Sequence, residues 1–233
     1  MRLFTAEDKM TSVIRSNYEI LPVLNRFGIR LGLGDVTIAE VCVTRKINID
    51  FFLIIINTFN HEEYFTAGIP PSVSPGLVIE YLRKTHVHYL NYIVPRLEQE
   101  LEKMIGRAPS GSPDLKVIDT FYRKYKKELL LHIGDEEENT FPYVLGLMTG
   151  SVKPGEGYNI KEFEREHSNL DTKLRDLRNL IIKYLRPEYD DNDCNEFLIS
   201  LSRFEKDLLD HARIEDKILV PMVQSIERKT AGK

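Results

Sequence analysis

Hydrophobic residues recur every three or four positions along four long stretches of the chain, which begin near residues 76, 114, 160 and 194. This spacing is typical of amphipathic helices that bury one face. Segments rich in glycine, proline or acidic residues separate the stretches, at residues 106–113, 149–157 and 186–193. Since helices joined by short connections pack antiparallel to their neighbours, the pattern predicts an all-α fold whose main part is an up-and-down antiparallel four-helix bundle.

A shorter pattern precedes the bundle. One helix is expected to end at Gly28, and Thr37 with Glu40 forms a capping box for a second. A third is expected from Asn48 or Asp50 to Asn60, and residues 69–75 contain three prolines and two serines. We therefore expect a small helical N-terminal domain at residues 1–66, a linker at 67–75 and the bundle at 76–233.

Charge and composition exclude several classes of protein. The formal net charge is -4, acidic and basic residues are mixed, and no basic block suggests a nucleic-acid partner. No apolar run approaches the roughly 18 residues of a membrane span, and the first residues do not resemble a signal peptide. The two cysteines, Cys42 and Cys194, lie far apart in the sequence, so we expect a reduced, cytoplasmic protein.

Polar residues interrupt each hydrophobic stripe at a position where the core is expected. Each stripe carries one histidine, and two stripes also carry a glutamate four positions later: His86, His132 with Glu136, His167, and His211 with Glu215. Residues four apart lie on one face of a helix, so each His–Glu pair offers a nitrogen and an oxygen to one point. Pro142 and Pro221 follow the paired histidines by ten positions and are expected to kink or end their helices.

Burying six such side chains without compensation would cost several kcal/mol for each carboxylate alone. Metal ions remove this cost because they bind neutral imidazoles and neutralise carboxylates. Four nitrogens and two carboxylates suit two transition metal ions, with iron as the first choice and manganese or zinc still open. The absence of thiolates from the set argues against an iron–sulfur cluster or a structural zinc site.

Two details of the sequence bear on the class of metal site and on the choice of its ligands. Ferritin-like di-iron bundles use Glu-x-x-His, whereas this chain has His-x-x-x-Glu, which argues against that class. His88 lies two positions from His86 and is expected to point away from the stripe, so it is the alternative to His86 as a ligand.

The two His–Glu phrases, together with Glu166-His167 between them, resemble the hemerythrin-like domain of the di-iron proteins that repair iron–sulfur centres. The N-terminal segments 21–29, 37–41 and 47–52 are similar to the small domain that precedes the bundle in that family. The resemblance implies a non-haem di-iron centre ligated by the four histidines and bridged by Glu136 and Glu215. It also implies a role in restoring iron–sulfur clusters damaged by nitric oxide or oxidants.

One part of the family pattern is missing, because residues 29–35 read Ile-Arg-Leu-Gly-Leu-Gly-Asp where the family carries adjacent cysteines. Thiol chemistry is therefore not carried over to this chain, and dimerisation or partner docking is an alternative role for the N-terminal domain.

Several functions use the same set of ligands. Besides cluster repair, a module that binds or senses dioxygen or nitric oxide without turnover stays open, as do a di-iron oxidoreductase and a metal-free scaffold. The sequence does not decide whether the protein is an enzyme. Expected partners are a small diatomic ligand, iron–sulfur proteins and a second copy of the chain.

Overall fold

The computed structural model describes residues 2–64, 68–108, 112–154, 160–186 and 189–231; side chains of residues 161–169 and 231 lie outside this description. The chain divides into two compact units, Met1–Thr85 with Asp210–Lys233, and His86–Leu209. Every named element in the described ranges is helical, which confirms the all-α prediction.

The N-terminal part of the first unit consists of short helices. They are α1 (Met10–Ser16), a 3-10 turn η1 (Tyr18–Ile20), α2 (Leu21–Arg26), α3 (Ile38–Arg45) and α4 (Ile49–Asn60). Gly28 follows α2 with φ +70°, a conformation that favours glycine. The capping box of Thr37 and Glu40 is present, and Asn48 caps α4 by accepting from the backbone N–H of Phe51 at 2.9 Å.

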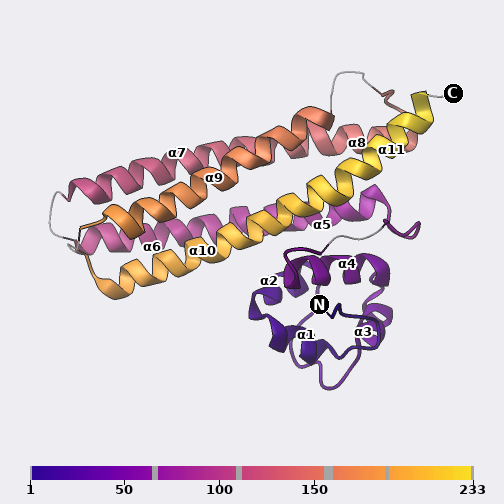
Figure 1. The fold of residues 1–233 in the computed structure, drawn as a ribbon, viewed down its shortest axis with the longest axis horizontal. Helices are drawn as coiled ribbons and strands as arrows, with labels where there is room; N and C mark the ends of the chain where they lie inside the picture. Colours follow the sequence, from indigo (N-terminus) through magenta and orange to yellow (C-terminus); the bar gives the residue numbers. More distant parts are fainter. Residues whose placement is uncertain (1, 65–67, 109–111, 155–159, 187–188, 232–233) are drawn as a thin grey trace. The chain divides into compact units, whose positions relative to one another are not determined.

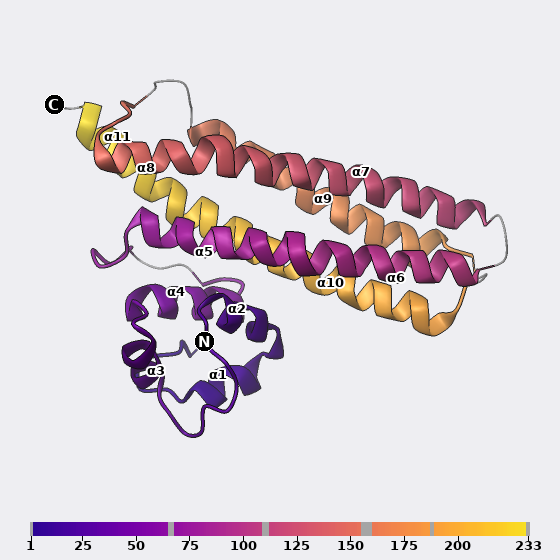
Figure 2. The same ribbon diagram turned by 180° about the vertical axis from the view of Figure 1, so that it is seen from behind.

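The longer helices follow, three of them interrupted by π-helical turns. Their order is α5 (Pro75–His88), η2 (Tyr89–Ile93), α6 (Val94–Arg107), α7 (Pro113–Asp135), η3 (Glu136–Thr140), α8 (Phe141–Thr149), α9 (Ile160–Tyr184), α10 (Asp191–Ile214), η4 (Glu215–Leu219) and α11 (Val220–Ala231). In the second unit α6, α7, α9 and α10 lie side by side, as the opposite views in Figures 1 and 2 both show. This arrangement confirms the predicted four-helix bundle.

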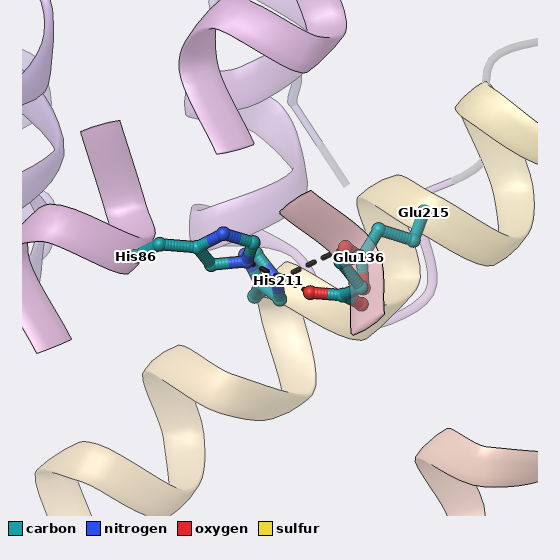
Figure 3. A group of neighbouring side chains, drawn as sticks. All are labelled: His86, Glu136, His211 and Glu215. Carbon is teal, nitrogen blue, oxygen red and sulfur yellow. Dashed lines mark ion pairs between the residues drawn. The ribbon is translucent and has the colours of Figure 1, made fainter. Parts of the chain in front are cut away.

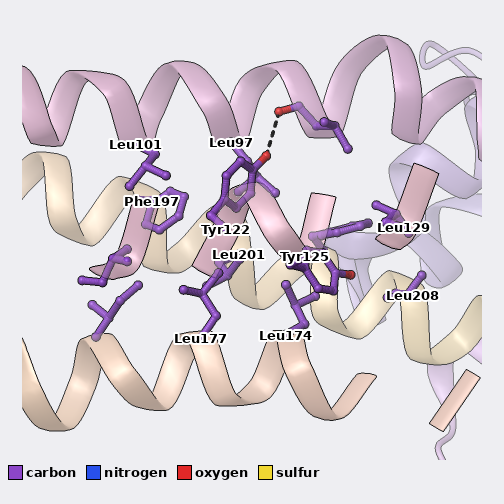
Figure 4. Close-up of a cluster of buried hydrophobic side chains, with 14 of the residues drawn as sticks. Leu97, Leu101, Tyr122, Tyr125, Leu129, Leu174, Leu177, Phe197, Leu201 and Leu208 are labelled. Carbon is purple, nitrogen blue, oxygen red and sulfur yellow. Dashed lines mark hydrogen bonds between the residues drawn. The ribbon is translucent and has the colours of Figure 1, made fainter. Parts of the chain in front are cut away.

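The bundle core follows the hydrophobic stripes read from the sequence. Its members include Leu97, Leu101, Tyr122, Tyr125, Leu129, Leu174, Leu177, Phe197, Leu201, Phe204 and Leu208. Figure 4 shows these side chains, apart from Phe204, between the helices. The Tyr122 hydroxyl satisfies its hydrogen bond by donating to the backbone carbonyl of Val94 at 3.2 Å. Full burial of one such leucine or phenylalanine contributes about 1.5–3 kcal/mol, so this packing holds the four helices together.

The prolines change the helices in a way the sequence did not predict. Pro95, Pro142 and Pro221 each occupy the second residue of an α-helix that continues from a π-helical turn. The backbone N–H just before Pro142, that of Phe141, bonds to the carbonyl of Glu136 five residues back. A proline cannot donate to the carbonyl four residues back and clashes with it in a regular α-helix. The wider π turn accommodates this defect, and the helical path continues past Pro142 and Pro221.

Candidate metal centre

In the second unit, two histidines converge on one buried carboxylate. Glu136 is the first residue of η3 and its side chain is 1% exposed. Its Oε1 lies 3.1 Å from the Nε2 of His132 one turn earlier, and its Oε2 lies 2.9 Å from the Nε2 of His86 on α5. The predicted one-face arrangement of His132 and Glu136 is therefore present.

The first unit repeats this arrangement at the end of α10. His211 Nε2 lies 3.1 Å from Glu215 Oε1, and the two side chains are 4% and 0% exposed. Glu215 opens the π turn η4, as Glu136 opens η3. Each His–Glu pair thus ends an α-helix and places its glutamate at the first position of a π turn, where such turns often mark functional sites.

Four buried side chains form a group that could hold a metal ion. Ligand atoms of His86, Glu136, His211 and Glu215 all lie within 4.8 Å of one another. Figure 3 shows these four side chains. Two carboxylates in a space of this size repel each other strongly unless a positive charge lies between them. Neutral imidazole nitrogens and carboxylate oxygens form a donor set that suits a divalent transition metal ion. The residues therefore fit a metal ion.

Glu137 has a part in the site that sequence reasoning missed. Its Oε1 lies 2.8 Å from the Nδ1 of His86, and its side chain is 33% exposed. Carboxylates in this position orient metal-binding histidines and fix their tautomer. The single sequence signal of an irregular turn here was Pro142, five positions further on.

Phe141 packs against the same histidine. Its ring stacks on that of His86, with centroids 5.6 Å apart and planes 10° from parallel. The ring of Phe141 therefore covers the imidazole of His86, while Glu137 contacts the Nδ1 of the same imidazole.

The remaining histidines differ in what the structure shows of them. His88 is half-buried and stacks on Tyr92 with centroids 5.3 Å apart, so His86 and not His88 is in the cluster. His132 contacts the cluster through Glu136, whose Oε1 lies 3.1 Å from the His132 Nε2. The predicted ligand His167 belongs to α9, and its side chain, like that of Glu166, falls outside the described residues.

The profile of the hemerythrin HHE cation binding domain matches residues 77–223, which include every element of the cluster. The chain belongs to this hemerythrin family. Its fold is thus a hemerythrin-like bundle with a helical N-terminal part, and its His/Glu cluster lies inside a cation-binding domain.

Similarity extends beyond the hemerythrin domain. The chain is 20% identical over 186 residues to a Staphylococcus haemolyticus protein named iron-sulfur cluster repair protein ScdA, covering 80% of this chain and 83% of that protein. A Staphylococcus epidermidis protein of the same name is 20% identical over 223 residues, covering 95% of this chain and all of the relative. Across the described residues, no helix has both the length and the apolar character needed to cross a membrane.

Proposed function

We propose that this chain is a cytoplasmic non-haem di-iron protein that helps to restore damaged iron–sulfur centres. The observation that carries the proposal is the convergence of His86, Glu136, His211 and Glu215 in a buried space. Membership of the hemerythrin family and similarity to proteins named for iron–sulfur cluster repair support it.

In this proposal, His86, His132, His167 and His211 would hold two iron ions together with the carboxylates of Glu136 and Glu215. Two His–Glu pairs with the same local geometry, on separate helices, favour two ions over one. A centre held by these six protein ligands would also be able to bind a small molecule such as dioxygen or nitric oxide. When bound, the ions would supply Lewis acidity and redox capacity, while the glutamates balance their charge and Glu137 orients His86.

The cysteines of the chain bear on the chemical route by which repair would occur. Cys42 and Cys194 are the only cysteines, and both are buried. Burial raises the pKa of the Cys42 thiol to about 11, which disfavours the reactive thiolate. The chain therefore lacks a reactive thiol pair, and we favour repair by donation of iron from the di-iron centre to an iron–sulfur protein partner.

The test is reactivation of an iron–sulfur enzyme inactivated by nitric oxide. We expect the iron-loaded chain to restore activity, and the His132→Ala and Glu215→Ala variants to restore none because each loses iron. Each variant should also be destabilised, since the remaining buried partners are left unpaired. Reactivation by the metal-free chain in the presence of a chelator would contradict iron donation.

The missing cysteine pair favours a second candidate, a module that binds or senses dioxygen or nitric oxide without turnover. This candidate predicts a stable adduct in the optical spectrum and no reactivation of the damaged enzyme. Sustained consumption of either gas with an electron donor would instead indicate an oxidoreductase.

A further inference from the structure

Arg213 lies between His211 and Glu215 in the sequence and contacts the N-terminal module, defined here as residues 2–64. Its Nη1 donates to the carbonyl of Thr58 at 3.1 Å, and its Nη2 donates to the carbonyl of His61 at 3.0 Å. A longer contact of 3.4 Å joins Nη2 to the carbonyl of Tyr64. All these residues belong to the first compact unit.

These contacts cap the C-terminal end of α4. The last carbonyls of a helix have no partner within it and carry partial negative charge, so a guanidinium there is favourable. Neighbouring carbonyls are satisfied differently, since that of Asn57 accepts from the backbone N–H of His61 and that of Phe59 accepts from the side chain of Asn17. Arg213 therefore supplies the bond that the Thr58 carbonyl needs.

Asp210 holds the guanidinium in this position. Its Oδ1 accepts from Arg213 Nη1 at 2.7 Å, and the two side chains are 6% and 22% exposed. A partly buried, charge-assisted bond of this kind restricts the arginine rotamer. Arg213 is thus fixed between its own helix and the end of α4.

A second arginine connects the module to α5. Arg26, which is 6% exposed, donates from Nη1 to the Tyr81 hydroxyl at 3.1 Å. Its guanidinium also lies 6.0 Å from the ring centre of Phe59 and 5.8 Å from that of Tyr81. Tyr81 lies five residues before His86 on the same helix.

We propose that the N-terminal module is a positioning element for the metal centre, with Arg213 as the positioning residue that transmits its docking to His211 and Glu215. This inference rests on the proposed di-iron function. A module that lacks the adjacent cysteine pair would then act by holding the helical turns that bear the ligands, through Arg213 on α10 and Arg26 against α5.

The experiment compares four full-length variants after iron loading: Arg213→Gln, Arg213→Lys, Arg26→Met and Arg228→Gln. Arg228 is the matched control, because it is exposed and its Nε donates to the carbonyl of Gln224 on its own helix. The readouts are the rate of iron release to a chelator, the charge-transfer absorption of the diferric protein, and amide hydrogen exchange of residues 58–64.

We expect Arg213→Gln to release iron about tenfold faster, which is the scale of one lost charged hydrogen bond. Its absorption should shift, and exchange of residues 58–64 should accelerate. Arg213→Lys should recover part of the effect, since lysine keeps the charge but not the two-pronged geometry. Arg26→Met should change release and exchange in the same direction, and Arg228→Gln should match the wild type.

Iron release by Arg213→Gln at the wild-type rate would overturn the inference and leave the proposed function intact. So would faster release in Arg213→Gln with unchanged exchange at residues 58–64 and no effect of Arg26→Met, because the arginine would then act only within α10. Failure of the wild-type chain to take up iron would overturn the proposed function itself, and this inference with it.

Discussion

At the scale of single residues, His86 has a carboxylate at each ring nitrogen. Nδ1 faces Glu137 at 2.8 Å and Nε2 faces Glu136 at 2.9 Å. A neutral ring that donates from Nδ1 to Glu137 keeps the Nε2 lone pair on the side of the buried cluster. Glu137 thus determines which nitrogen is available to a metal ion.

Substitution of Glu137 tests this role. We predict that Glu137→Gln lowers iron affinity by about tenfold, because a neutral amide holds the imidazole less firmly than a carboxylate. Glu138→Gln is the control, because Glu138 is exposed and its substitution removes the same charge from the same turn. Competition with a chromophoric chelator measures the iron affinity of both variants. An equal loss of iron affinity in the two variants would show that Glu137 acts only through its charge and not through its contact with His86.

The choice between His86 and His88 can be tested in the same assay. We predict that His88→Ala retains both iron ions, because His88 stacks on Tyr92 and lies outside the buried cluster. His86→Ala should lose iron. Loss of iron from His88→Ala with retention in His86→Ala would reverse the ligand assignment.

At the scale of helices, the π turns η3 and η4 each begin at a glutamate of the cluster. The sequence predicted the His–Glu faces and the cap of α3 because these depend on residues three or four apart. It did not predict the π turns, because one additional residue per turn hardly changes a hydrophobic stripe that already alternates between steps of three and four. For the same reason the contact of Glu137 with His86 was missed.

Deletion of Asn139 tests the importance of the π turn. Removing one residue from η3 should turn it into a regular α-helical turn, in which the ring of Pro142 meets the carbonyl four residues back. This clash should cost about 3 kcal/mol or more. The deletion variant should have a lower unfolding temperature and a lower iron content than the wild type, while Asn139→Ala should resemble the wild type in both. A deletion variant with wild-type unfolding temperature and iron content would contradict this account.

A buried acid near the start of α10 joins that helix to α6. Asp193 is 1% exposed, and the hydrogen bond from Lys103, followed by the charge of Arg107, lowers the pKa of its carboxyl. A lowered folded-state pKa adds stability above the unfolded value of about 3.9, and this stability is lost as pH falls through the folded value.

Asp193→Asn should therefore be less stable than the wild type near neutral pH. The difference should shrink as the pH falls below about 3.9, since the wild-type carboxyl then becomes neutral as well. Urea unfolding of both proteins from pH 7 to pH 3 measures this difference. A difference that stays constant over the whole range would show that the ion pairs contribute nothing.

At the scale of the whole molecule, the long periodic stripes made the bundle predictable, because burying a continuous apolar face leaves few alternatives. The sequence predicted which histidines and glutamates belong to the cluster, but it did not predict the contacts between them. Its ligand atoms come from α5, η3, α10 and η4, so a bound ion would link segments far apart in the sequence. Binding of this kind stabilises the folded chain, since the unfolded chain has no such site.

The most direct test of the central claim is the number of iron ions retained per chain after anaerobic reconstitution and desalting. The wild-type chain should retain two, and a variant with both His211→Ala and Glu215→Ala should retain fewer. Retention of less than one ion by the wild type, or equal retention by the double variant, would contradict a di-iron centre at this cluster.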